Sequence, residues 1–177
     1  KNIQIILGLI ALVLGGLLSA CGPEARLDMV GMFAGTSPTI NERFEESKLY
    51  NEKHGFATLQ APVDDYRVYV CTDTHVTKTQ TRWTYFIDTY RHDMLCPVAV
   101  HLGDIIDAQN YFDEMYTAYD EVPLNPAKHD TLMAVAGNHD IYFKQWPEFL
   151  KYFKTCYYYF VVETPSGEKD LFIIYDS

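Results

Sequence analysis

VAVHLGDIID, at residues 98–107, is the stretch from which the fold class of this 177-residue chain can be inferred. Its first residues favour a β-strand, and Gly103 allows the chain to turn out of that strand. Asp104 follows the glycine directly, and Asp107 comes three positions later. Two carboxylates beside a strand end indicate either a positively charged ligand at that place or a cap on a following helix.

Short apolar strands alternate with helical stretches beyond the segment PVDD. The first two strands are about 30 residues apart, which is the length of a βαβ unit. We therefore expect an α/β fold, in which ligand sites form beyond the carboxyl ends of the strands. The expected strands are 66–72, 97–103, 131–137, 157–163 and 169–177, and the expected helices are 81–93, 110–121 and 143–153.

Polar residues follow the first of these strands in the motif D-x-H. If the extended conformation continues, Asp73 and His75 place their side chains on one face, because they are two positions apart. A carboxylate and an imidazole on one face can chelate a metal ion. The alternative for so short a motif is an exposed loop.

The other two strand ends carry the motifs GDIID and GNHD. Asp104 can bridge two cations about 3.5–4 Å apart through its two oxygens, whereas Asp107 can be a ligand, a helix cap or an acid that orients a histidine. Asn138 can coordinate a hard cation through its carbonyl oxygen. His139, one position off the ligand face, is available for proton transfer or for stabilising charge. Three such clusters at successive strand ends argue against the alternative that these residues only form turns and helix caps.

These motifs in this order resemble the calcineurin-like metallophosphoesterases over about residues 66–177. The resemblance implies a four-layer αββα sandwich and a centre of two divalent metal ions, Mn, Fe or Zn. It also implies hydrolysis of a small phosphoester, by a phosphatase or a phosphodiesterase, with a hydroxide that bridges the two metals. The substrate itself is not indicated by the motifs.

The resemblance assigns metal ligands position by position. Asp73 and His75 would bind the first metal, and Asp104 would bridge the two ions. Asn138 would bind the second metal and contact the substrate phosphate.

The remaining motif residues would have catalytic or supporting roles. His139 would act on the leaving group or on the charge that develops at phosphorus, and Asp107 would orient it. Gly103 and Gly137 would support the turns, and Asp140 would be structural. His101 is expected to pack in the interior or to support the ligands.

The first 20 residues have the pattern of an export signal. Lys1 precedes a long apolar run that closes on small residues before Cys21, and LSAC resembles the lipobox of bacterial lipoproteins. A transmembrane anchor is the alternative, because the run is near the roughly 20 residues that a span needs. The glycines at 15 and 16 favour the lipoprotein. Cys21 would then be lipidated, and the protein would be an extracytoplasmic lipoprotein of a bacterial membrane, in the periplasm or at the cell surface.

Residues 21–65 have weak periodicity and are expected to be a tether and N-terminal extension with one short helix at 41–53. The phosphoesterase domain would occupy 66–177. In the family pattern, further histidine segments follow, but this sequence has no histidine after His139. We therefore expect the N-terminal half of the sandwich, truncated at its C-terminus and inactive, or nearly so, by itself.

Composition excludes several other functions. A hydrophobic content of 48% suits a packed core, and a net charge of −10 argues against nucleic-acid binding. A serine or cysteine hydrolase lacks support, since there is no G-x-S-x-G segment and Cys71 is expected to be buried. The remaining alternative is a non-catalytic surface lipoprotein that uses the same fold for binding.

Overall fold

The computed structural model describes residues 37–107, 111–142 and 144–176. The expected signal at 1–20 and the expected lipidation site Cys21 lie outside these ranges. Within them, no helix combines the length and the apolar character that a membrane crossing requires.

The first sheet is parallel and contains the three strands from which the motifs emerge. Its order is β2 (Val68–Cys71), β3 (Val98–His101) and β4 (Leu132–Ala134). All four residues of the central strand β3 are buried, as expected for a parallel strand covered on both faces. The three predicted strands are therefore confirmed, although each is shorter than expected at both ends.

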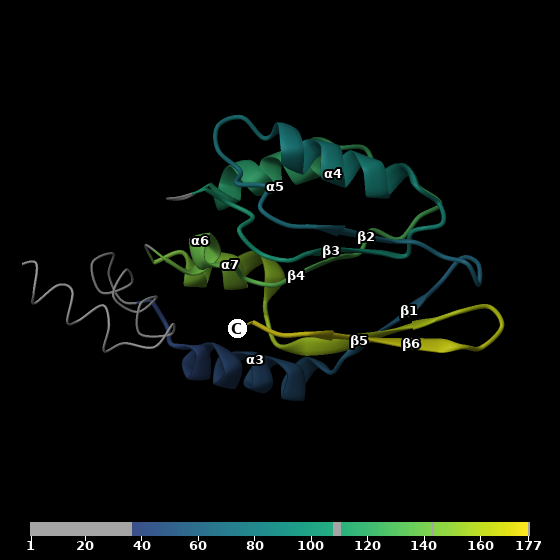
Figure 1. Ribbon diagram of the computed structural model, residues 1–177, viewed down its shortest axis with the longest axis horizontal. Coiled ribbons are helices and arrows are strands. Elements are labelled where there is room, and N and C mark those ends of the chain that lie inside the picture. The colour runs from purple at the N-terminus through teal and green to yellow at the C-terminus, as the bar shows by residue number, and fades with distance from the viewer. Residues whose placement is uncertain (1–36, 108–110, 143, 177) are drawn as a thin grey trace, which may run out of the picture.

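Two helices cover the outer face of this sheet, α4 (Thr81–His92) and α5 (Phe112–Glu121) (Figure 1). Trp83 and Phe112 are fully buried in the core beneath these helices, and the Trp83 indole donates a hydrogen bond to the Met115 carbonyl (2.9 Å). Two shorter helices follow β4: α6 is Asn138–Ile141 and α7 is Trp146–Phe153.

The second sheet has the order β1 (Ala57–Gln60), β5 (Tyr158–Glu163) and β6 (Lys169–Ile174). The antiparallel pairing of β5 with β6 confirms the predicted hairpin. Strand β1, which pairs in parallel with β5, was not predicted, and it lies in the stretch expected to be a tether. Its four residues alternate between half-buried and exposed, which is too short a pattern to be recognised in the sequence.

Helix α3 (Ile40–His54) lies close to the predicted 41–53 and belongs to the fold. It begins at a capping box in which Thr39 and Glu42 satisfy each other's backbone N–H groups. Its buried face is polar: Arg43 forms an ion pair with Asp176, and the Ser47 hydroxyl accepts a hydrogen bond from the Cys156 backbone (3.2 Å). A helix that packs through polar residues has no apolar periodicity, so the tether expected at 21–65 is wrong for this helix and for β1.

The four layers are α4 with α5, the first sheet, the second sheet, and α3 (Figure 1). Between the sheets, Val98 and Val100 of β3 pack with Phe160 and Val162 of β5. The α/β class and the αββα order of layers are therefore confirmed. Successive side chains of a strand point to opposite faces of the sheet. The other two residues of β3, Ala99 and His101, therefore point toward the helices on the outer face.

Candidate metal centre

The loops that follow β2 and β3 run side by side and are joined through their backbones. Three hydrogen bonds of 2.7–3.1 Å connect them, with donors in the D-x-H segment and carbonyl acceptors in the GDxxD segment. They run from Asp73 to Gly103, from His75 to Asp104, and from Val76 to Ile105. The pairing of the two parallel strands thus continues into the loops and holds the two motifs against each other.

Three of the expected metal ligands have a left-handed backbone. The φ angles are 54° for Asp73, 46° for His75 and 52° for Asp104. The expectation that the extended conformation continues through the D-x-H motif is therefore wrong. The left-handed turns nevertheless bring the side chains together, because Asp73 Oδ1 lies 3.5 Å from His75 Nε2. Such conformations are unfavourable for residues other than glycine and cluster at functional sites.

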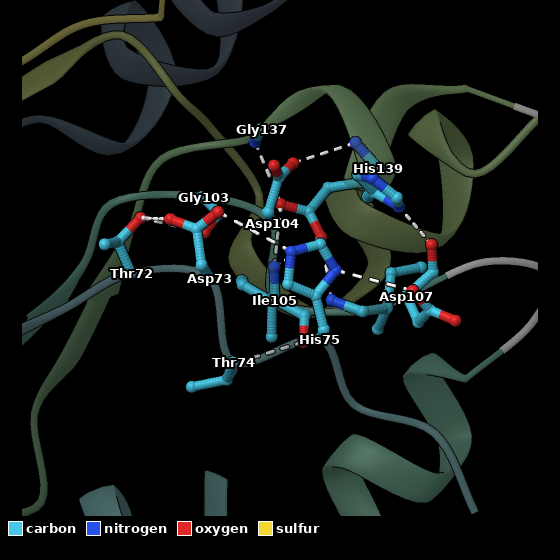
Figure 2. Close-up of polar contacts among 12 residues, drawn as sticks. Thr72, Asp73, Thr74, His75, Gly103, Asp104, Ile105, Asp107, Gly137 and His139 are labelled. Carbon is cyan, nitrogen blue, oxygen red and sulfur yellow. Dashed lines mark hydrogen bonds and ion pairs between the residues drawn. The ribbon is translucent and has the colours of Figure 1, made fainter. Parts of the chain in front are cut away.

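The side chains form two groups that can each hold a cation. In each group the candidate ligand atoms lie within 4.8 Å of one another; the first consists of Asp73, His75 and Asp104, and the second of His75, Asp107 and His139. The His75 imidazole lies between them, with Nδ1 3.5 Å from Asp107 Oδ1 (Figure 2).

The first group contains the three residues expected to bind the first metal. The structure brings them together, while their role as ligands stays a prediction. The residue common to both groups is His75, whereas the resemblance implied a bridge through Asp104. One oxygen of Asp104 accepts a hydrogen bond from the His139 backbone (2.9 Å), so Asp104 also contacts the third motif. Asn138, the expected ligand of the second metal, is exposed at the start of α6.

His139 contacts Asp107, but through the backbone rather than through the carboxylate that the resemblance implied. Its Nδ1 lies against the Asp107 carbonyl, which can only accept, so Nδ1 carries the proton. The Asp107 carboxylate faces His75 instead. The His139 ring stands edge-on to the His75 ring, with 4.6 Å between centroids. This arrangement leaves His139 Nε2 as the nitrogen that can exchange a proton with a substrate.

The Asp140 side chain connects the GNHD motif to the GDxxD motif. Its carboxylate is fully buried and accepts hydrogen bonds from the backbone N–H groups of Gly137 (2.9 Å), Ile105 (3.0 Å) and Ile106 (3.2 Å). Burial raises the pKa of Asp140 to about 7, and the three N–H donors oppose that shift. The carboxylate thus joins the GNHD turn to the GDxxD loop.

Gly103 and Gly137 lie against each other where these two motifs meet. A Cβ at Gly137 would lie 2.2 Å from the Asp104 backbone nitrogen, and a Cβ at Gly103 would lie 2.6 Å from the Gly137 nitrogen. Neither place has room for a side chain. The close approach of the two turns therefore requires a glycine on each side.

A comparison with protein families gives a match that covers most of the described chain. The family model for calcineurin-like phosphoesterases matches residues 66–176, well over half of the sequence. The chain belongs to this family. Searches of the curated proteins and of the solved structures found no match.

The site fits the divalent cations on which calcineurin-like phosphoesterases depend. Carboxylate oxygens and imidazole nitrogens suit Mn, Fe and Zn. A hydrogen bond from the Thr72 hydroxyl (2.6 Å) lowers the pKa of Asp73, which keeps this carboxylate ionised. In the part of the chain that the structure describes, the ion pairs of Asp73 and Asp107 are made with His75, and none involves Lys or Arg. A bound cation would balance this negative charge.

Two features near the site differ from the sequence expectations. Cys71 is only partly buried, not fully. Burial nevertheless raises the pKa of its thiol, so Cys71 is a poor nucleophile. This agrees with the lack of support for a cysteine hydrolase. Thr74, the central residue of the D-x-H motif, is buried between its two polar neighbours. Sequence analysis missed it, because a threonine in a short polar loop gives no signal of burial.

Proposed function

We propose that this chain builds part of the active site of a metal-dependent phosphoester hydrolase, a phosphatase or phosphodiesterase with two divalent metal ions. The observation that carries the proposal is the convergence of Asp73, His75 and Asp104 to within 4.8 Å at the carboxyl ends of parallel strands. Membership of the calcineurin-like phosphoesterase family supports it. The substrate is a small phosphoester.

The proposed roles follow from the position of each side chain. Asp73, His75 and Asp104 would hold divalent metal. Asn138, which is exposed, would contact the second ion and the substrate phosphate. Bound divalent cations supply positive charge at the phosphoryl oxygens and lower the pKa of a water molecule. His139, with its Nδ1 proton fixed on the Asp107 carbonyl, presents Nε2 to the leaving group for proton transfer.

Metal removal tests the proposal directly. We expect the full-length protein, with any residues that its gene encodes beyond position 177, to hydrolyse p-nitrophenyl phosphate or bis(p-nitrophenyl) phosphate in the presence of Mn²⁺. After treatment with EDTA the rate should fall to that of a buffer blank, because the metals provide the charge that activates water. Release of p-nitrophenolate measures this rate.

The control separates metal loss from damage to the protein. Dialysis of the EDTA-treated protein into metal-free buffer should leave the rate at the blank, and addition of Mn²⁺ should restore it. A rate that persists through chelation contradicts the proposal. Metal binding without turnover of either ester favours the alternative, a non-catalytic protein that uses the fold for binding.

We also propose that residues 1–20 export the protein and that Cys21 attaches it to a bacterial membrane by lipid, outside the cytoplasm. The support is the sequence LSAC after the apolar run. We expect the wild type to incorporate an alkynyl fatty acid in cells and Cys21→Ser to incorporate none.

The matched control is Cys71→Ser, which also removes one thiol and should leave labelling unchanged. The mass of the mature N-terminus distinguishes the alternatives. A protein that retains the residues before Cys21 and carries no label is held by a transmembrane anchor instead.

A further inference from the structure

A buried polar pair lies directly beneath the candidate metal ligands. His101, the last residue of β3, is 0% exposed, and Thr74 is 5% exposed. His101 Nε2 lies 3.0 Å from the Thr74 hydroxyl, and this hydroxyl lies 3.0 Å from the Ile105 carbonyl. The pair thus joins the end of the central strand to both the D-x-H segment and the GDxxD loop (Figure 2 shows the contact of Thr74 with Ile105).

The direction of these hydrogen bonds follows from the groups involved. The Ile105 carbonyl can only accept, so the Thr74 hydroxyl donates to it and accepts from His101 Nε2–H. His101 Nδ1 has no partner within the described ranges, which is tolerable for an acceptor. The opposite tautomer would leave a buried N–H unpaired, which is rarer. Burial lowers the pKa of His101 to about 4, so the ring is neutral.

The position of Thr74 explains why this pair matters for the ligands. Both of its neighbours, Asp73 and His75, have left-handed backbones, and the Asp73 side chain is exposed. Packing therefore does not hold Asp73 in place. Besides the hydrogen bond from the exposed Thr72 hydroxyl to the Asp73 carboxylate, the segment is held by the backbone bonds to the neighbouring loop and by the buried Thr74 hydroxyl between the two ligands.

We propose that Thr74 and His101 are positioning residues of the metal centre, which hold Asp73 and His75 in the left-handed geometry that binds a divalent cation. This inference rests on the proposed function, because it concerns the same ligands. Hydrogen bonds behind a metal site orient the ligands, and their loss lowers metal affinity.

Mn²⁺ binding to the intact protein tests the proposal, with the electron paramagnetic resonance signal of free Mn²⁺ as the readout. Thr74→Val keeps the shape and removes the hydroxyl, and we expect it to weaken Mn²⁺ binding by about 10-fold or more. Thr74→Ser keeps the hydroxyl and should stay within about 3-fold of the wild type.

The matched control is Thr164→Val. Thr164 is also 5% exposed and accepts a hydrogen bond from Glu168 N, but it lies in the hairpin of the second sheet. It should lose stability without a change in Mn²⁺ affinity.

A substitution of His101, the hydrogen-bond partner of Thr74, provides an independent test. His101→Phe removes the N–H donor, and the pocket already contains the Trp83 and Phe86 rings, with centroids 5.7 and 5.9 Å from His101. We expect it to weaken Mn²⁺ binding as Thr74→Val does. Combining the two changes should add little to either alone, because both break one connection.

The outcomes are distinct for this inference and for the proposed function. If the wild type binds no Mn²⁺, the proposed metal centre fails and the inference with it. If the wild type binds Mn²⁺ and Thr74→Val binds equally well, only the positioning role is overturned. It is overturned too if Thr74→Ser loses as much affinity as Thr74→Val, or if Thr164→Val does.

Discussion

Replacement of Asp104 by asparagine is expected to abolish metal-dependent turnover in the intact protein while leaving it folded. Asp104 belongs to the first ligand group, and the resemblance to the calcineurin-like phosphoesterases implies that it bridges two ions. Loss of a partner behind a ligand alone costs about 10–100-fold, so loss of the Asp104 carboxylate itself should cost at least about 100-fold. The rate of p-nitrophenolate release with saturating Mn²⁺ measures the effect.

The fold should survive because the substitution keeps the shape of the side chain. Asp104 Oδ1 accepts a hydrogen bond from the His139 backbone, and the amide oxygen of asparagine can accept it equally. We expect the free energy of unfolding to change by less than about 1 kcal/mol. Urea unfolding of the wild type and the variant checks this expectation.

Asp120→Asn is the matched control, because it makes the same change of charge at an exposed position of α5. It should have wild-type activity. Wild-type turnover by Asp104→Asn would overturn the bridging role. A variant that loses both activity and stability would show that Asp104 supports the fold.

The sequence predicted the first sheet well because the features that specify it are local. Each strand is an apolar run that ends at a motif, and the parallel βαβ arrangement brings those ends to one edge of the sheet. This topology places Asp73, His75 and Asp104 at one edge of the sheet, and the left-handed turns then bring their side chains together. Their presence at one place could therefore be predicted without knowledge of any side-chain contact.

The arrangement of the ligands within the site could not be predicted in this way. The left-handed backbones of Asp73 and His75 depend on hydrogen bonds to a loop 30 residues away in sequence. Spacing also does not reveal that the Asp107 carboxylate faces His75 instead of His139. Helix α3 was located but taken for part of a tether, because its buried face is polar and its partners, such as Asp176, lie far along the chain.

The replacement of Gly103 by alanine is expected to have the largest effect on stability. Gly103 has a φ of 96°, and an added Cβ would lie 2.6 and 2.8 Å from backbone atoms of Gly137. The left-handed backbone costs an alanine about 1–2 kcal/mol, and forcing apart two packed turns costs about 1–3 kcal/mol more. We therefore expect the free energy of unfolding to fall by about 2–5 kcal/mol, measured by urea unfolding.

Gly167→Ala separates the two contributions. Gly167 has a similar φ of 89° in the hairpin between β5 and β6, but a Cβ there would meet no atom within 4 Å. It should lose only the backbone contribution of about 1–2 kcal/mol and keep its Mn²⁺ affinity. Gly103→Ala should lose Mn²⁺ affinity as well, because the two displaced turns carry Asp104 and His139, which contact each other. Equal losses of stability in the two variants, with Mn²⁺ binding intact in both, would contradict the close approach of the GDxxD and GNHD turns.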